Sequence, residues 1–442
     1  MTKVGFISLG CSKNLVDTEV MLRRLHDSGF EITPDETEAE IIIINTCGFI
    51  ESAKQESIDN ILDAEKLKEW GKCRHIIATG CLVERYREEV MRELPEIDAL
   101  LGVGSLSDIA EACLAVMRGE KYTSFKDKNT SRLGGERILT TPEHTAYLKI
   151  AEGCDNKCTY CAIPLIRGKF RSRSIEDIVN EARDLEALGV KELNLIAQDT
   201  SRYGLDIYGE YSLARLVREI CLATDIPWIR LLYCYPDKIT DELIDEMRDN
   251  PRLLKYMDMP IQHISDSVLK NMNRHGDNTL IRGVVKKLRE RVPGIVLRTT
   301  AMVGFPGESE EDFTELCEFI KEAKFDRFGA FTYSEEEGTA SFGFDGKIDE
   351  QTKQDRYDIL MQTQLTVTEE QNAKKVGSVY TVLCEGFDTV AEVYYGRSYA
   401  DAPDVDGRIY FTSQKKLSEG EFAEVEITEA LDYDLVGHRI EK

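Results

Sequence analysis

The sequence has no apolar run long enough to cross a membrane. A transmembrane helix needs about 18 to 20 apolar residues, whereas the longest apolar burst, residues 41–44, is followed at once by Asn45-Thr46-Cys47. Residues 1–6 enter a predicted strand directly and lack the layout of a signal peptide. With 42% hydrophobic and 31% charged residues, the chain is predicted to be a soluble globular protein of the cytoplasm.

Basic residues are scarce relative to acidic ones. The 56 Lys and Arg residues face 81 Asp and Glu residues, which gives a formal net charge of −25. A general nucleic-acid binder is normally basic, because phosphate neutralisation dominates its affinity. The charge therefore disfavours RNA binding and favours a basic protein partner or a small substrate. The sequence also lacks a serine-triad context and a phosphate-binding P-loop.

Cysteine, in contrast, is plentiful. Twelve cysteines without a secretion signal indicate metal ligands or buried thiols in a reducing compartment. Cys154, Cys158 and Cys161, which we call the core cysteine set, have the spacing Cys-x3-Cys-x2-Cys. Three thiolates fit three corners of a cubane iron–sulfur cluster and leave the fourth iron open to a substrate or cofactor. A structural zinc site needs a fourth ligand, and residues 162–201 contain no His or Cys. Zinc-binding or simply buried cysteines are the alternative.

A second group of cysteines follows predicted strands in residues 1–123. Apolar strands alternate there with helical patterns, as in a parallel α/β domain, and are expected at residues 4–9, 41–44, 75–79 and 98–103. Cys11, Cys47 and Cys81, which we call the N-terminal cysteine set, each lie just past the carboxyl end of a strand. Such ends share one edge of an open parallel sheet, so these cysteines are predicted to converge on one metal site. Three small buried residues in tight turns are the alternative. Cys73 and Cys113 lack this position and are interpreted as structural.

Three further segments follow the first domain. Residues 124–144 are polar and predict a linker. Residues 145–373 alternate strands with charged helices, which predicts an open (β/α)6 partial TIM barrel. Its strands are expected at residues 146–150, 193–196, 228–232, 256–259, 295–300 and 328–331. Residues 376–442 contain short alternating strands separated by turns, which predicts a small antiparallel β-barrel.

Charge is concentrated at two places. Residues 376–442 hold 14 acidic and 6 basic residues, a net charge of −8. This predicts a surface for a cationic partner, with Asp401, Asp404 and Asp406 among its contacts; a merely solvated acidic face is the alternative. The basic run at residues 167–173 follows the core cysteine set. It is interpreted as steering an anionic cofactor or an acidic substrate residue, or as pairing with the acidic surface.

The residues around both cysteine sets resemble known signatures. The core set, with Tyr160 as the aromatic residue before its last cysteine, resembles the motif of radical S-adenosylmethionine (SAM) enzymes. The turns at residues 10–14, 45–47 and 79–81 resemble the N-terminal domain of the methylthiotransferases, a branch of that superfamily. The resemblance covers the whole chain and implies a radical SAM core and a C-terminal TRAM domain. It also implies two 4Fe–4S clusters, one on the core set that cleaves SAM to a radical and one on the N-terminal set that handles sulfur.

The resemblance also suggests residues that contact SAM. Gln198 follows a core strand where many radical SAM enzymes hold the SAM amino group, although the usual Gly-Gly-Glu is absent. Residues 304–308 resemble the turn near the adenosine, with a plain Gly/Pro loop as the alternative. Arg298 is able to bind a carboxylate with two hydrogen bonds, but it suits a structural ion pair equally well. His263 is interpreted as structural, and no catalytic residue is predicted beyond the cluster ligands and the SAM contacts Tyr160, Gln198 and Arg298.

Within the methylthiotransferases, residues 7–19, 153–158 and 396–407 resemble the branch that acts on small-subunit ribosomal protein twelve. The tRNA-modifying branch typically has Gln-Met-Asn after the first cysteine. The resemblance implies methylthiolation of an aspartate β-carbon in that basic protein, recruited by the acidic TRAM domain, with an electron donor such as flavodoxin or ferredoxin. This β C–H is not acidic enough for ordinary base catalysis, so a radical is needed. A tRNA-base methylthiotransferase and a non-catalytic iron–sulfur electron carrier or ribosome-binding module are the alternatives.

Overall fold

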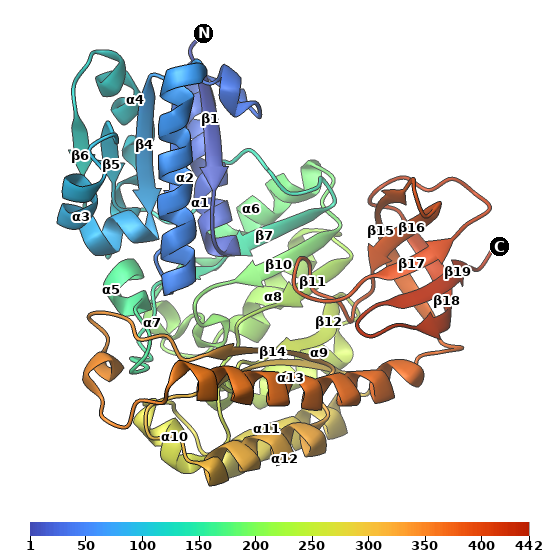
Figure 1. Ribbon diagram of the computed structural model, residues 1–442. Helices are drawn as coiled ribbons and strands as arrows, with labels where there is room; N and C mark the ends of the chain where they lie inside the picture. Colours follow the sequence, from blue (N-terminus) through green and yellow to red (C-terminus); the bar gives the residue numbers. More distant parts are fainter. Residues whose placement is uncertain (442) are drawn as a thin grey trace.

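The N-terminal domain is a parallel sheet of six strands covered by helices on both faces (Figure 1). The computed structural model describes residues 1–441. The strand order is β2-β1-β3-β4-β5-β6. The strands are β1 (Lys3–Ser8), β2 (Glu31–Thr33), β3 (Ile41–Thr46), β4 (His75–Gly80), β5 (Ala99–Leu101) and β6 (Tyr122–Ser124). Helices α2 (Glu51–Trp70) and α3 (Cys81–Glu93) pack on one face, while α1 (Ser12–Asp27) and α4 (Ile109–Met117) pack on the other. Double coverage explains why every residue of β3 is buried.

The sequence predicted four of these six strands. The other two, β2 and β6, lie at the edges of the sheet and contain three residues each, which is too short to establish a period of two. The predicted linker is half-buried or exposed over most of its length but is anchored at a buried residue. Arg137 in this segment is buried, and its Nη1 donates to Glu19 on α1 at 2.8 Å while Nη2 donates to the carbonyl of Tyr147. The segment therefore ties the first domain to the second.

The central domain is the predicted open partial barrel. Its sheet is parallel throughout, in the order β14-β13-β12-β11-β10-β7. The six strands are β7 (Thr145–Lys149), β10 (Glu192–Ile196), β11 (Trp228–Leu231), β12 (Leu253–Asp258), β13 (Val296–Val303) and β14 (Arg327–Thr332). All six were predicted, because each contains apolar residues between helical segments; five are mostly buried, whereas β14 is half-buried beyond Arg327. A short antiparallel pair, β8 (Ala151–Glu152) with β9 (Arg171–Ser172), was not predicted.

Helices cover the outer side of this sheet (Figure 1). They are α6 (Ile175–Ala187), α7 (Leu205–Tyr208), α8 (Leu213–Ala223), α9 (Asp241–Asp249), α10 (Asp266–Asn271), α11 (Asn278–Arg291), α12 (Glu310–Ala323) and α13 (Glu350–Ala373). The short α5 (Ile163–Arg167) lies instead against the N-terminal domain. The long α13 leads into the last domain. No helix within residues 1–441 is both long and apolar enough to span a membrane.

The C-terminal domain is a closed barrel of five strands. They are β15 (Val379–Asp388), β16 (Val393–Arg397), β17 (Ile409–Thr412), β18 (Phe422–Ala430) and β19 (Leu435–Arg439). The predicted antiparallel pairing holds except between β17 and β19, which are parallel. A ring with an odd number of strands cannot alternate direction all the way round, so one parallel pair is required for closure.

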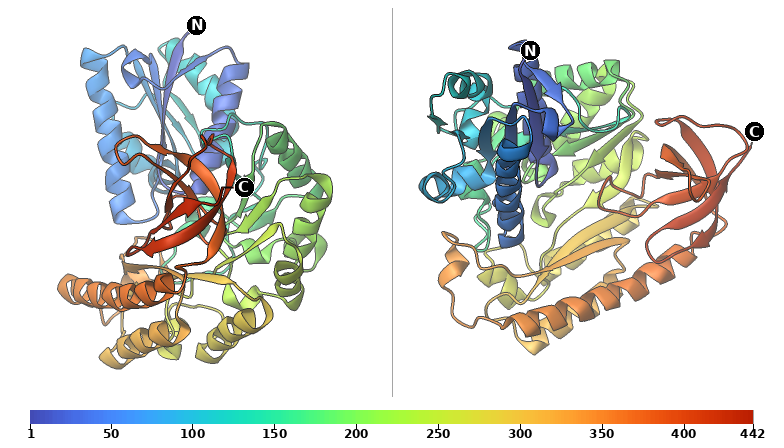
Figure 2. Two further views of the ribbon diagram at one scale, coloured as in Figure 1. Left: turned by 90° about the vertical axis from the view of Figure 1, so that its right-hand side faces the viewer. Right: turned by 45° about the horizontal axis from the view of Figure 1, so that its top comes forward.

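The loop between β16 and β17 docks the barrel into the open side of the central sheet (Figure 2). Asp401 forms a buried ion pair with Arg327 at the start of β14. Tyr256 on β12 donates to Asp406 at 2.6 Å, and Tyr147 on β7 donates to Asp404 at 3.0 Å. The prediction that these aspartates contact a partner is therefore wrong for Asp401 and Asp406, whose side chains are only 2% and 3% exposed. Buried carboxylates need buried partners, and both find them inside the molecule. Asp404 is exposed, so its contact with a partner stays a prediction.

Candidate functional site

One cysteine of the N-terminal set lies at the interface between the first two domains, beside the segment that follows the core set. Cys81 lies in one apolar cluster with Ala162 and Ile166, which directly follow the core set in the chain. In Figure 1 the carboxyl edge of the N-terminal sheet lies against α5 and the start of the central domain. Carboxyl ends of strands are where parallel α/β folds bind ligands. Both domains thus contribute their ligand-binding edge to one region.

The N-terminal cysteine set is assembled by three neighbouring strands. Cys11 precedes α1, Cys47 follows β3 and Cys81 begins α3, while β1, β3 and β4 are adjacent in the sheet. Gly10 has a φ of +86°, and a Cβ atom there would lie 2.9 Å from the Cys47 sulfur. The chain beside Cys11 therefore passes directly over Cys47, which only glycine permits. The three cysteines thus lie at the carboxyl ends of adjacent strands, as the sequence placed them; that they bind one metal stays a prediction.

The core cysteine set lies on a braced loop. Gly153 has a φ of +77°, and a Cβ atom there would lie 2.1 Å from the carbonyl oxygen of Lys169. Inside the loop, the Asn156 side-chain amide donates to Asp199 at 2.8 Å and accepts from Lys238 at 2.9 Å. Cys154 and Cys158 are buried. These contacts hold the loop without help from a bound group.

Four of the six thiols sit in buried surroundings that disfavour a free thiolate. Burial raises the pKa of Cys81 to about 12 and that of Cys154 to about 11, and it also raises the pKa values of Cys47 and Cys161. Thiolate ligands form when metal binding displaces the proton. The sites therefore suit bound metal rather than nucleophilic thiol chemistry.

The chemistry of the donors, three thiols in each set, is what a cubane cluster requires. Within residues 1–441, no group of three His, Cys, Asp or Glu side chains is close enough to hold one metal ion. In a cubane cluster each thiolate binds a different iron, whereas all ligands of a zinc ion bind the same atom. An iron–sulfur cluster at each set stays a prediction from the sequence.

Polar and aromatic groups beside the core set fit a SAM molecule. Gln198 donates from Nε2 to Glu152 at 2.6 Å, while its buried Oε1 has no partner among the described residues. An unsatisfied buried acceptor suits a ligand ammonium group. Tyr160 packs edge-to-face on Phe305, with ring centroids 6.5 Å apart, and Phe305 belongs to the predicted adenosine turn. Gln198 and Tyr160 thus remain predicted SAM contacts.

A buried carboxylate shapes that turn. Glu308 accepts backbone hydrogen bonds from Gly304 at 2.8 Å and Phe305 at 3.3 Å, and it pairs with Arg356 at 2.8 Å. Burial raises the pKa of Glu308 to about 7. His263 accepts from the backbone of Ser265 at 3.0 Å and is fully buried, which agrees with its structural interpretation.

Arg298 is engaged within the protein. Its Nη1 donates to Asp258 at 2.9 Å, and its Nε lies 3.6 Å from Asp406 of the C-terminal loop. The contacts support the structural alternative over the SAM carboxylate that the sequence suggested.

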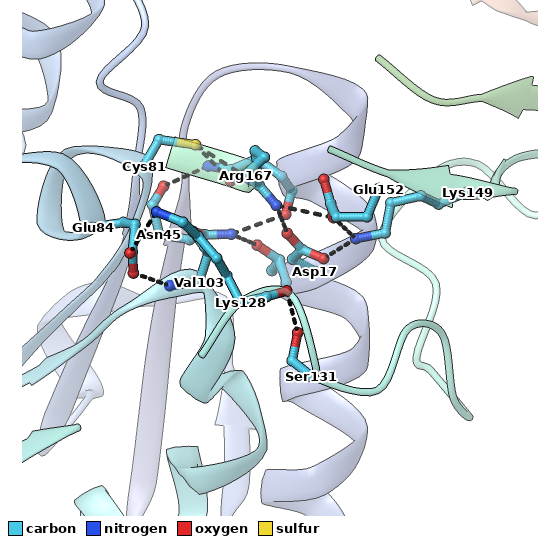
Figure 3. Close-up of polar contacts among 12 residues, drawn as sticks. Asp17, Asn45, Cys81, Glu84, Val103, Lys128, Ser131, Lys149, Glu152 and Arg167 are labelled. Atoms are coloured by element: carbon cyan, nitrogen blue, oxygen red, sulfur yellow. Dashed lines mark hydrogen bonds and ion pairs between the residues drawn. The ribbon is translucent and has the colours of Figure 1, made fainter. Parts of the chain in front are cut away.

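A buried polar network across the domain interface was not predicted (Figure 3). Arg167 and Lys149 of the central domain contact Asp17 on α1 and Glu152 on β8. All four side chains are at most 7% exposed. The available signals were Lys149 at the end of an apolar strand and Arg167 at the start of the basic run. Neither identifies a partner more than one hundred positions away.

Family models match three segments of the chain. They are the uncharacterized protein family UPF0004 over residues 3–102, the radical SAM superfamily over residues 148–320 and the TRAM domain over residues 376–440. Among solved structures, the radical SAM methyltransferase TsrM from Kitasatospora setae has a TM-score of 0.57 at 15% identity, covering 75% of this chain and 73% of that chain. The cobalamin-dependent radical SAM enzyme OxsB has a TM-score of 0.51 at 12% identity, covering 84% and 56%. These likenesses show the fold.

Curated relatives match over almost the full length. The ribosomal protein uS12 methylthiotransferase RimO of Thermoanaerobacter sp. (strain X514) is 49% identical, covering 99% of this chain and 100% of the relative. The RimO of Caldanaerobacter subterraneus subsp. tengcongensis is 50% identical with the same coverage. These relatives, the three matched domains and the two converging cysteine sets lead to one conclusion: the chain belongs to the RimO family of radical SAM methylthiotransferases.

Proposed function

We propose that this protein transfers a methylthio group to the β-carbon of an aspartate in ribosomal protein uS12, using SAM and two 4Fe–4S clusters. The observation that carries the proposal is that Cys81 of the N-terminal set packs against Ala162 and Ile166 and contacts Arg167, all in the segment that follows the core set. Curated relatives named for this reaction on uS12 support the substrate. A radical route is required because the β C–H is a very weak acid, beyond the reach of a side-chain base.

The chain's own residues divide the task between two domains. The core set and the N-terminal set each hold one cluster; when bound, the clusters supply the electron for SAM cleavage and a site for the sulfur. Tyr160 and Phe305 form an apolar wall for SAM, and the free Oε1 of Gln198 accepts from its ammonium group. Holding both reactants in one region turns an encounter into an intramolecular step, which is a large proximity effect.

The partners follow from charge and chemistry. Exposed acidic residues remain on the C-terminal barrel after the docking loop is discounted, among them Glu419, Glu429 and Asp432. They suit a basic ribosomal protein and disfavour RNA. A low-potential donor such as flavodoxin or ferredoxin supplies electrons, and the reaction takes place in the cytoplasm, where ribosomal proteins are made.

The test is mass spectrometry of uS12 and of tRNA from cells with and without this chain. We expect the aspartate of uS12 to lose its methylthio group when the chain is absent, while tRNA is unchanged. Loss of a methylthio group from tRNA, with uS12 unchanged, would establish the tRNA alternative. Anaerobic turnover of the purified protein should release 5′-deoxyadenosine from SAM; its absence would leave only the electron-carrier alternative.

A further inference from the structure

Arg167 connects the two cysteine sets. It is the last residue of α5, the short helix that begins two positions after Cys161. Gly168, with a φ of +77°, ends this helix. The Arg167 side chain is only 3% exposed and points out of the central domain toward the N-terminal sheet (Figure 3).

The two ends of its guanidinium group have different partners. Nη2 donates to the Cys81 sulfur at 3.3 Å and to the Asn14 side-chain oxygen at 2.6 Å. Nη1 donates to Asp17 at 2.6 Å and to Glu152 at 3.3 Å. The guanidinium group is planar and holds its N–H donors in fixed directions, so one Arg side chain can bind partners on two sides at once. Arg167 thus contacts a predicted cluster ligand of one domain while it is anchored by carboxylates from both.

The balance of charge explains why a cation is kept here. Asp17 and Glu152 are neutralised by Arg167 and Lys149, so the network has no net charge in itself. A cysteine that ligates iron adds a negative charge. Within residues 1–441, no cation other than Arg167 makes a hydrogen bond to Cys81. The N–H group therefore meets a sulfur whose negative charge depends on the oxidation state of the cluster.

We propose that Arg167 is a positioning residue of the sulfur-handling site, which raises the reduction potential of the N-terminal cluster and holds Cys81 against the helix that follows the core set. Hydrogen bonds to cluster sulfurs and local charge are recognised determinants of such potentials. A positive group at the sulfur stabilises the more negative, reduced cluster. The inference rests on the proposed function, because it assumes a cluster on the N-terminal set.

Lys149 provides a matched control. It is as buried as Arg167, with 4% of its side chain exposed, and it contacts the same two carboxylates. Within residues 1–441 its Nζ donates to Asp17 and Glu152 and makes no hydrogen bond to Cys81. Replacing either residue by Met therefore removes one cation from the same network, and only Arg167→Met removes the hydrogen bond to the sulfur.

The experiment uses the full chain with all three cysteines of the core set replaced by Ala, so that the N-terminal cluster is observed alone. After anaerobic reconstitution with iron and sulfide, the iron content and the midpoint potential are measured, the latter by a titration monitored by electron paramagnetic resonance. We expect Arg167→Met to shift the potential to more negative values. Arg167→Lys, which keeps the charge but not the fork, should recover part of the shift, and Lys149→Met should shift it much less.

An unchanged potential in Arg167→Met, or an equal shift in Lys149→Met, would overturn the inference. If Arg167→Met fails to retain iron while Lys149→Met retains it, the positioning role of Arg167 is supported. If both variants lose iron, Arg167 acts only as part of the domain interface, and the inference is overturned. The iron content of the parent is read first. A parent without iron would refute the two-cluster proposal itself, which separates that failure from failure of the Arg167 inference.

Discussion

The two cysteine sets are built in opposite ways. The core set lies within eight consecutive residues on one loop, braced by hydrogen bonds from Asn156 and by the tight turn at Gly153. The N-terminal set is spread from Cys11 to Cys81 and exists only because three strands of one sheet are neighbours. The core set is therefore a local structure placed on a barrel, whereas the N-terminal set is a product of the whole domain. The first should tolerate changes elsewhere; the second should depend on its sheet.

The largest effect is expected from removing each set in turn. The intact protein should hold about eight iron atoms, four per cubane cluster, and either triple Cys→Ala variant should retain about four. Methylthiolation should be lost in both. SAM cleavage should be lost only without the core set, since that set faces the predicted SAM residues. Iron analysis and 5′-deoxyadenosine assays check this; a full iron load in either variant would contradict the assignment.

A substitution that weakens docking of the C-terminal barrel tests whether iron binding at either cysteine set depends on the third domain. Asp401→Ala removes one partner of the buried pair with Arg327, whose side chains are 2% and 6% exposed. Breaking such a pair costs about 3–5 kcal/mol, so urea unfolding should show a large loss of stability. Asp432→Ala, at an exposed site of the same barrel, is the control. Iron content should be unchanged in both, and its loss in Asp401→Ala would show that barrel docking supports a cysteine set.

Substitutions at two glycines test directly whether the core set is a local site and the N-terminal set an assembled one. In Gly80→Ala the new Cβ would meet Asn45 Oδ1 at 2.4 Å beside Cys81, and in Gly153→Ala it would meet the Lys169 carbonyl beside Cys154. A non-glycine residue in these conformations costs on the order of 1–3 kcal/mol. Gly80→Ala should lower iron only at the N-terminal set and spare SAM cleavage. Gly153→Ala should do the reverse.

Gly189→Ala is the control for both variants. Gly189 has a φ of +98° but no atom within 4 Å of a new Cβ, so it carries the backbone strain without the clash. Its iron content should match the parent. If Gly80→Ala and Gly153→Ala lowered iron equally at both sets, the distinction between a local and an assembled site would fail.

The smallest effect is expected on the barrel surface. Glu429 and Asp432 are exposed acidic residues near the β18–β19 turn. Their replacement by Lys should slow association with uS12 and leave SAM cleavage unchanged, because surface charges act mainly on encounter. The difference should vanish at high salt, where the Debye length falls to about 3 Å at 1 M. Stopped-flow binding across a salt series measures it; unchanged association at low salt would exclude this face as the contact surface.

Much of this architecture was accessible from the sequence. The six strands of the central sheet contain apolar residues between helical segments, and the strands before Cys11, Cys47 and Cys81 end in recognisable turns. The strands β2 and β6 escaped prediction because three residues at a sheet edge carry too little pattern. The fifth strand of the barrel, β19, also has a weak apolar pattern. Its position between β17 and β18 follows only from closure of the barrel.

The sequence by itself determined the spacing of the core set, the alternation of strands and helices, and the order of the three domains. These properties depend on neighbours in the chain, through periodicity and turn chemistry. Only the tertiary structure decided that Arg167 contacts Cys81 and that Asp401 faces Arg327 rather than a partner. The physical reason is that a buried charge is stable only beside a complementary group, and the identity of that group depends on where residues distant in the chain come to lie.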